Sequence, residues 1–176
     1  MSIDADEVVT TDLRTEIEKA LQQQKFNGYY IPRLSSYCGR QIRYGGWWPD
    51  YVLRLFRRNT GYFTESVVHE RIVVQGEIGK LTSPLLHDAF VSLDEVLRKV
   101  NDYSSLGAEM LRQKGVQSSL SKAIFKAFWI FIRTYLLKAA FLDGRQGLML
   151  SISNAEGTYY KYVKLLELQN RQSRQE

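Results

Sequence analysis

The segment SIDADEVVTTDLRTEIEKAL (residues 2–21) joins an acidic turn to a regular pattern of apolar residues. Three residues precede Asp4, whereas a buried strand needs roughly four to eight, so the strand expected before the acids is cut short. Apolar residues then recur at helical spacing, and Thr11 or Asp12 suits the N-cap of the predicted helix. This order of strand, acidic turn and helix predicts an α/β domain.

Asp4 and Asp6 are separated by a single residue. In α/β proteins ligands bind at the carboxyl ends of strands, so acids at such an end face a ligand rather than the core. Two carboxylates at this spacing can hold a divalent cation that neutralises a bound diphosphate. The alternative is that they decorate a turn and favour the N-terminus of the following helix. The short motif alone leaves both interpretations open.

Composition limits the class of protein without choosing a function. The chain has 176 residues, of which 44% are hydrophobic and 24% charged, which fits one compact domain or a large piece of one. A net charge of +5 permits an anionic partner but does not distinguish nucleic acid, phosphate ligand and membrane surface. Cys38 is the single cysteine, and no secretory leader pattern is present, so we expect a cytosolic protein without an internal disulfide.

The middle of the chain alternates short predicted strands with loops. Residues 26–43 predict a strand followed by a loop around Ser35, Ser36 and Gly39, and residues 51–56 predict a second strand. Between them, GGWWPD (residues 45–50) breaks regular structure. Its two Trp rings could stack on sugar rings or simply anchor the loop.

Charged and imidazole side chains of the middle region are candidates for a site. Arg54 and Arg57 could place guanidinium groups against a diphosphate or an anionic acceptor, although a solvated charge cluster is the alternative. VVHE (residues 67–70) presents an imidazole and a carboxylate after an apolar run. His87 is a weaker candidate for a metal or phosphate contact, and a structural histidine is the alternative for it.

Several stretches occur in the order found in bacterial lipopolysaccharide-core glycosyltransferases of family 2, and the chain resembles their β-1,4-glucosyltransferase-like branch. The resemblance runs over essentially the whole chain. The matching stretches are SIDADE (2–7), GGWWPD (45–50), LRLFRR (53–58), VHE (68–70), LH (86–87) and FLDG (141–144).

This resemblance implies the carboxyl-terminal part of a GT-A (Rossmann-like) domain, with the upstream nucleotide-binding half missing from the chain. It implies a nucleotide-sugar donor, with UDP-glucose expected, and Mg²⁺ or Mn²⁺ held by Asp4 and Asp6, with His87 as a weaker ligand. An inverting transfer needs a general base for the acceptor hydroxyl, and the resemblance places that role on Glu70. Donor or acceptor contacts are expected from Trp47, Trp48, Asp50, Arg54, Arg57 and His69.

The carboxyl-terminal third is expected to be helical. Residues 93–111 predict one or two amphipathic helices packed on the sheet, and residues 123–142 are apolar nearly all round except for three cations. These cations disfavour a membrane span, so we expect a helix that lies in the membrane interface, with a buried helix as the alternative. A turn at 143–147 and a helix over 148–168 complete a hairpin.

The predicted organisation is therefore a partial GT-A catalytic domain (1–115) and an amphipathic hairpin at the membrane interface (116–176). The predicted function is transfer of a hexose to a lipopolysaccharide core or other lipid-linked acceptor, at the inner face of the cytoplasmic membrane. A non-catalytic remnant that binds a membrane or a partner through its last helices is the alternative. Nucleic-acid binding ranks last because no recognised motif accompanies the charge.

Overall fold

A computed structural model of the chain describes residues 1–63 and 72–172. Contacts divide the chain into two compact units. The first consists of Met1–Ser36 and Trp47–Ala89, and the second consists of residues 37–46 together with the chain from Phe90 onward. The two units are described separately.

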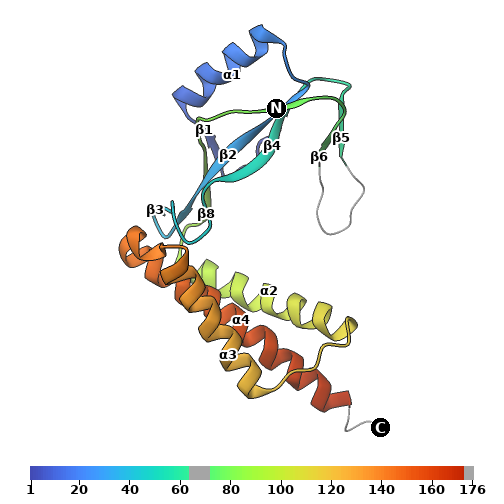
Figure 1. Cartoon of the computed structure of the whole chain (residues 1–176), viewed down its shortest axis with the longest axis vertical. Coiled ribbons are helices and arrows are strands. Elements are labelled where there is room, and N and C mark those ends of the chain that lie inside the picture. Colours follow the sequence, from blue (N-terminus) through green and yellow to red (C-terminus); the bar gives the residue numbers. More distant parts are fainter. Residues whose placement is uncertain (64–71, 173–176) are drawn as a thin grey trace. The chain divides into compact units, whose positions relative to one another are not determined.

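The first unit is built on a curled mixed sheet with one helix (Figure 1). Strand β2 is central, because it pairs antiparallel with β4 and parallel with β7, while β1 and β8 pair antiparallel. A separate antiparallel pair is formed by β5 and β6. The elements are β1 (Glu7–Val9), α1 (Thr11–Gln23), β2 (Gly28–Tyr37), β4 (Asp50–Phe56), β5 (Gly61–Phe63), β6 (Ile72–Val74), β7 (Ile78–Lys80) and β8 (Leu85–Phe90).

The acidic turn comes before the first strand, not after it as predicted. Residues 1–4 have no regular structure, a turn covers residues 5–6, and β1 follows. The segment before the acids is too short to pair as a strand. The N–H of Ser2 donates a hydrogen bond of 2.8 Å to the carbonyl of Arg54. Helix α1 is confirmed, with Thr10 as its N-cap, one residue before the expected position.

The core of the first unit lies between α1 and the sheet. Leu13, Ile31 and Leu85 are fully buried and come from α1, β2 and β8 respectively. They belong to one cluster whose other buried members are Ala20, Tyr29, Leu55 and Leu81. The helix therefore covers one face of the sheet, and the polar residues described below belong to other positions of the same strands.

Ser35 and Ser36 lie within β2, so the predicted loop begins later than expected, and of its three residues only Gly39 lies in the turn. Their hydroxyls bond to side chains of β8, which allows two polar residues to continue the strand. The turn falls later, where Cys38 and Gly39 both have positive φ. It leads into the two-residue strand β3 (Arg40–Gln41), at the end of the sheet order β1-β8-β2-β3.

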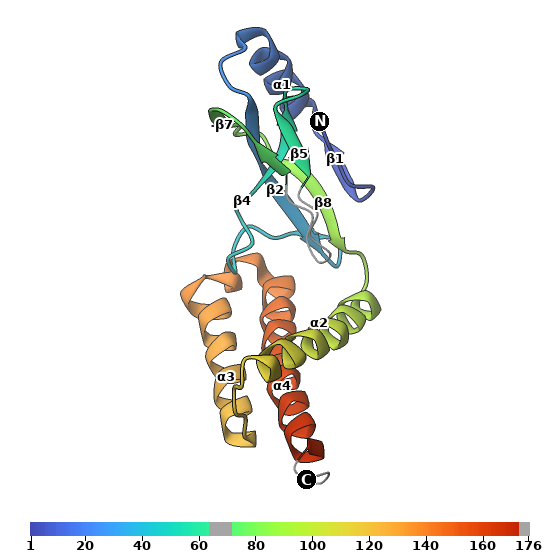
Figure 2. The ribbon, with the colours of Figure 1, turned by 90° about the vertical axis from the view of Figure 1, so that its right-hand side faces the viewer.

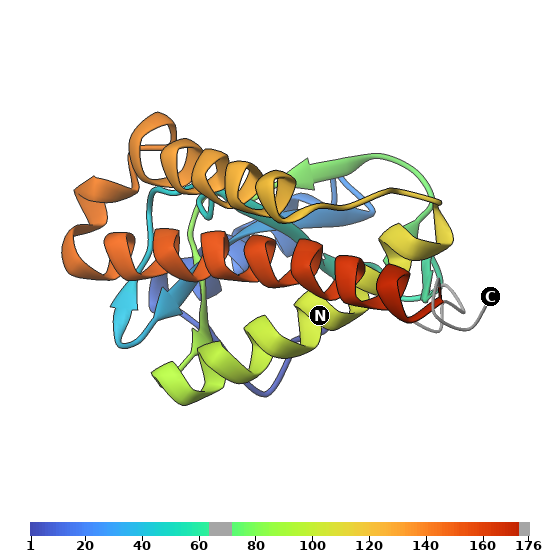
Figure 3. The same cartoon turned by 90° about the horizontal axis from the view of Figure 1, so that it is seen from below.

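The second unit contains three long helices, α2 (Leu93–Gln113), α3 (Leu120–Ile132) and α4 (Gly144–Gln172) (Figures 2 and 3). Both α2 and α3 pack against α4. Helix α2 forms one helix, where one or two were predicted, and it packs against α4. Packing of this helix on the sheet stays a prediction. The predicted hairpin is formed by α3 and α4.

The apolar stretch over 123–142 is not one continuous helix. Helix α3 ends at Ile132 and is followed by a π-helical turn (Arg133–Leu137) and a 3-10 turn (Ala140–Asp143), with Ala139 at positive φ between them. Within the described part of the chain, no helix is long and apolar enough to cross a membrane. Helix α4 then begins at Gly144, inside the predicted turn.

A buried carboxylate lies in the turn between the two helices of the hairpin. Asp143 is 3% exposed, and its carboxylate accepts hydrogen bonds from the backbone N–H groups of Arg43 at 3.1 Å and Tyr44 at 2.8 Å. The next N–H, of Gly45, donates to the carbonyl of Lys138 at 2.8 Å. These bonds attach the 43–45 segment to the helices of the second unit.

Candidate functional site

The acidic turn is held by its own backbone and by Glu7. The N–H of Glu7 donates to the carbonyl of Asp4 at 3.1 Å, and the N–H of Asp4 donates to Glu7 Oε2 at 3.1 Å. The Glu7 side chain is fully buried, while those of Asp4 and Asp6 are 56% and 51% exposed. One acid therefore supports the turn from inside, and two present their carboxylates outward.

Arg54, on β4, connects the buried acid to the exposed one. Its Nη2 donates to Glu7 Oε1 at 2.7 Å and also to Asp4 Oδ2. Burial alone would lower the pKa of Arg54, but the bonds and charges of Glu7 and Asp4 outweigh it and raise that pKa above its ordinary value. The Arg54 Nε is buried and has no hydrogen-bond partner among the described residues. The arrangement leaves Arg54 charged and fixed beneath the turn.

A second arginine extends this network across β2 and β4. Arg33 Nη1 lies 3.7 Å from Glu7 Oε1, and Arg33 donates through Nε and Nη2 to Asp50 Oδ2 at 3.0 and 2.7 Å. The register pairs Arg33 with Asp50 across the two strands. The Glu7 carboxylate thus faces two guanidinium groups.

His87 lies between an acid and a hydroxyl. The β1–β8 register places it opposite Glu7, and its Nε2 is 3.3 Å from Asp6 Oδ2. Its Nδ1 is 2.9 Å from the hydroxyl of Ser35, which is 7% exposed. The two contacts fix the orientation of the ring so that Nε2 faces the acidic turn.

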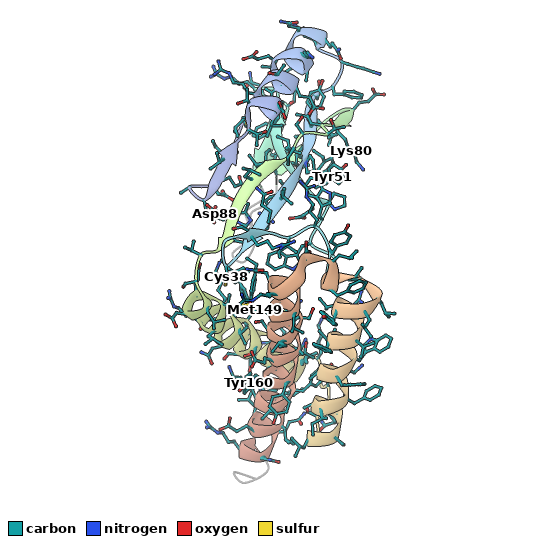
Figure 4. All side chains as sticks on the ribbon, turned by 90° about the vertical axis from the view of Figure 1, so that its left-hand side faces the viewer. Cys38, Tyr51, Lys80, Asp88, Met149 and Tyr160 are labelled. Atoms are coloured by element: carbon teal, nitrogen blue, oxygen red, sulfur yellow. The ribbon has the colours of Figure 1, made fainter. Side chains whose placement is uncertain are left out.

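The next residue of β8 makes a separate contact. Asp88, labelled in Figure 4, accepts a bond of 2.9 Å from the hydroxyl of Ser36. Its N–H donates to the carbonyl of Asp6 at 2.9 Å. Ser35 and Ser36 therefore serve different partners, the first the imidazole and the second a carboxylate.

Asp4 and Asp6 are the two acids of the turn that a divalent cation could contact. Asp4 and Asp6 offer exposed carboxylate oxygens, which Mg²⁺ and Mn²⁺ prefer. Over residues 1–63 and 72–172, no three His, Cys, Asp or Glu side chains are grouped so as to hold a metal ion. Mg²⁺ is commonly bound by one or two carboxylates with substrate phosphates and water, and this turn supplies that many. Binding would have to compete with Arg54 and His87 for the same oxygens.

The other expected site residues are distributed differently. Trp47 and Trp48 are half-buried in the irregular segment before β4, as predicted for that segment. Arg57 lies elsewhere in the first unit, where its Nη2 donates to the carbonyl of Gln24 at 3.3 Å. It lines a cavity of about 300 Å³ with Leu21, Phe26, Tyr29 and Leu55.

His69 and Glu70, the expected acceptor contact and general base, lie outside the described residues. Around the acidic turn the structure has two sets of side-chain contacts, which together we call the polar network: Asp4–Arg54–Glu7–Arg33–Asp50 and Asp6–His87–Ser35.

Three members of this network were not predicted as site residues. Glu7 follows the acidic pair directly, and the signal available was a third acid ahead of two apolar residues. Arg33 lies in a strand of mostly apolar residues, and a charged side chain buried there needs a hydrogen-bond or ion-pair partner. Ser35 carried no signal of its own, because its role depends on the position of His87 on another strand.

The first unit is thus a mixed α/β sheet whose strand β1 is preceded by a turn with two exposed acids. Comparison with known proteins points to sugar transfer. The chain is 29% identical, along 94% of its length, to the lipopolysaccharide core biosynthesis glycosyltransferase LpsC of Rhizobium meliloti, and the match covers 63% of that protein. It is 26% identical, along 96% of its length, to uncharacterized glycosyltransferases of Rickettsia typhi and Rickettsia prowazekii, with 62% of each covered.

The chain is thus similar to bacterial glycosyltransferases over nearly its whole length, and the resemblance found in the sequence is confirmed. It spans just under two thirds of the length of these relatives. No family model matches the chain, and no solved structure matches it. The mixed α/β class is confirmed, and the architecture is consistent with the expected GT-A domain.

Proposed function

We propose that the chain is the acceptor-side part of an inverting family-2 glycosyltransferase that moves a hexose from a nucleotide-sugar to a lipid-linked saccharide. The observation that carries the proposal is the exposed acid pair of one turn, each acid held by a cationic or imidazole partner from another strand. Similarity to a lipopolysaccharide core glycosyltransferase supports the saccharide acceptor, and UDP-glucose is the donor we propose.

In this proposal Asp4 and Asp6 bind Mg²⁺ or Mn²⁺ together with the donor diphosphate, and the cation offsets negative charge on the leaving group. Arg54 and Glu7 act as positioning residues, because they hold the turn from beneath. His87 lies close enough to Asp6 to contact the same ligand.

The proposed reaction is a single displacement at the anomeric carbon. The acceptor hydroxyl oxygen forms a bond to that carbon while the bond from the carbon to the diphosphate oxygen breaks. The hydroxyl proton passes to Glu70, and the diphosphate departs with the bonding electrons. Trp47 and Trp48 are proposed to offer apolar ring faces to the sugars.

The first test measures cation and nucleotide binding, which needs no complete reaction. Free Mn²⁺ is followed by electron paramagnetic resonance as the chain is added, with and without UDP-glucose. Asp4→Asn and Asp6→Asn are expected to weaken binding at least about tenfold, since each removes one anionic ligand. Asp12→Asn is the control, because Asp12 is an exposed acid in the first turn of α1. Equal Mn²⁺ binding by all four proteins would refute the cation site.

The second test concerns the base. In a version of the protein with the upstream half restored, transfer of labelled hexose to a lipid-linked saccharide is compared for the parent and Glu70→Gln, and a loss of about a hundredfold or more is expected for a general base. A rate for Glu70→Gln within a few-fold of the parent would remove that assignment.

We also propose a location at the cytoplasmic membrane for the enzyme, because a lipid-linked acceptor resides in a membrane.

A further inference from the structure

Helix α3 and the turn after it carry an apolar surface that no described element covers. Six large apolar side chains on them are between 48% and 66% exposed: Ile124, Phe125, Phe128, Trp129, Leu136 and Leu137. We call these six residues the α3 face. Single exposed apolar residues are normal, but a contiguous set of this kind marks an interaction surface.

The charges of the segment that carries the α3 face are mainly positive, and one acid of α4, Glu156, lines the groove between the two helices. Between Glu109 and Glu156 the sequence has seven Lys and Arg residues and one acid, Asp143. That acid is 3% exposed and is bonded to backbone N–H groups, so it does not offset the cations at the surface. The exposed face of this segment is therefore both apolar and cationic.

The spacing separates the two properties around the helix. Phe128 and Trp129 lie three and four residues after Phe125, so the three side chains lie on one side of the helix. Lys126 and Arg133 are seven residues apart and share a neighbouring side, where both are exposed. An apolar sector flanked by cations is the pattern of a helix that lies in the plane of a membrane interface.

The hollow beside α3 continues the apolar surface. An open groove of about 360 Å³ lies between α3 and α4, lined by Ile124, Phe128, Phe131, Ile152, Tyr159 and Tyr160 among others. Tyr160, labelled in Figure 4, stands on α4 with 45% exposure. Both helices belong to the same unit and pack together, so the groove and the α3 face form one surface.

We infer that the α3 face with Lys126, Arg133 and Lys138 binds the surface of a bilayer that contains acidic phospholipid. Thirteen residues of α3 span about 20 Å, well short of the roughly 30 Å hydrocarbon core, so the helix lies along the interface. The apolar side chains enter the acyl boundary, and the cations meet lipid phosphates. The inference deepens the proposed function by naming its membrane surface, but it does not need the enzyme to be active.

Two other occupants fit the surface less well. A second copy packed on the same face in a symmetric dimer would bring Lys126 and Arg133 of one chain against those of the other. Charged residues are also depleted in the cores of protein interfaces. A nucleic acid would meet the cations but would leave Leu136 and Leu137 without a role, because its binding uses aromatic stacking and phosphate contacts.

Vesicle flotation of the chain tests the inference. The chain is mixed with phosphatidylcholine vesicles with or without phosphatidylglycerol, and binding is measured at low and high salt. Binding to the anionic vesicles that weakens with salt is expected. Lys126→Gln with Arg133→Gln should lower the partition coefficient about 25-fold, because each cation near an anionic surface contributes about a factor of five. Phe125→Ser with Trp129→Ser should lower it about tenfold or more.

Matched variants distinguish this surface from general stickiness. Lys19→Gln with Arg58→Gln removes the same charge from exposed sites of the first unit. Tyr103→Ser with Leu106→Ser removes residues that are 65% and 62% exposed on α2, a helix that also carries acids. Both controls should bind like the parent, with circular dichroism confirming that every variant is folded. The inference would be overturned if the parent bound neutral and anionic vesicles equally, or if the control variants lost as much binding as the α3-face variants. It would also be overturned if the parent were a dimer and the α3-face variants were monomers.

Failure of this inference and failure of the proposed function are separable. Loss of vesicle binding in the α3-face variants does not depend on Mn²⁺, and Asp6→Asn should bind vesicles like the parent. A chain that binds vesicles but neither cation nor nucleotide would retain the membrane surface and lose the transferase proposal.

Discussion

Replacing Arg54 with Met should destabilise the first unit because it leaves a buried carboxylate with a weaker partner. The side chain of Arg54 is 15% exposed and that of Glu7 is not exposed at all. Removing one member of a buried ion pair costs about 3–5 kcal/mol. Glu7 keeps the Asp4 N–H at 3.1 Å and Arg33 at 3.7 Å, so the lower end, about 3 kcal/mol, is expected.

A double variant shows whether the loss arises from the unpaired charge. In Arg54→Met with Glu7→Gln, the amide keeps an acceptor for the Asp4 N–H but carries no charge that needs a cation. The double variant should therefore be more stable than the sum of the single changes predicts, by about 2 kcal/mol. Arg14→Met is the surface control, since its pair with Glu18 is 77% and 58% exposed, and it should change stability by less than about 0.5 kcal/mol.

The free energy of unfolding is measured by urea titration followed by circular dichroism and tryptophan fluorescence. If Arg54→Met lies within about 1 kcal/mol of the parent, or if the two changes add, then Glu7 does not depend on Arg54 as the geometry implies.

Three further predictions concern other parts of the chain. Burial would raise the pKa of Glu16, but hydrogen bonds from Ser83 and Thr82 hold that pKa below 4.5. The ionised Glu16 therefore stabilises the fold above pH 4.5, and this stabilisation is lost as the pH falls below that value. The parent should thus lose more stability than Glu16→Gln between about pH 5 and about pH 3. Ser35→Ala should weaken Mn²⁺ binding about tenfold, because His87 loses the Nδ1 partner that orients it; a similar loss in Ser36→Ala, whose hydroxyl bonds to Asp88, would contradict that role. Gly147→Ala should destabilise α4 by about 3 kcal/mol or more, because its Cβ would lie 1.8 Å from the Ala140 carbonyl oxygen. Gly157→Ala, where the nearest atom is 3.9 Å away, should instead stabilise the helix by about 0.5–1 kcal/mol; thermal unfolding compares the two, and a reversed order would refute the packing.

Elements with a strong local pattern could be predicted from the sequence. Strand β4 and helix α2 begin and end within two residues of the ranges expected from alternation and helical spacing. The irregular GGWWPD segment also follows from its Gly and Pro residues, since Gly45 and Gly46 both have positive φ. Local sequence determines these features because the interactions that form them lie within a few residues of each other.

The network around the acidic turn could be predicted only in part. The acid pair itself was evident, but its partners depend on strand register: Arg33 meets Asp50 through the β2–β4 pairing, and His87 meets Asp6 because β1 pairs with β8. A shift of one residue in either register would turn these side chains to the opposite face. Such long-range pairing has no signature in the spacing of residues along the chain.

The end of α3 was missed for a different reason. The apolar stretch continues past Ile132 without a Gly or Pro, so its composition predicts an unbroken helix. The backbone nevertheless changes to a π-helical turn and then reverses direction at Ala139. Packing in the second unit, where Thr134 and Ala140 are buried, takes precedence over the local preference.

The division of the chain into two units determines where it can be cut. The polypeptide passes between the units three times, after residues 36, 46 and 89, so a fragment beginning at Phe90 would lack ten residues of the second unit. Among those residues, Tyr37 and Ile42 are almost completely shielded from solvent, and Tyr37 is bonded to Ser153 on α4. A fragment made of the helices would therefore need segment 37–46, either fused to it or supplied as a co-expressed peptide. Limited proteolysis between residues 36 and 47 should lower the stability of both units.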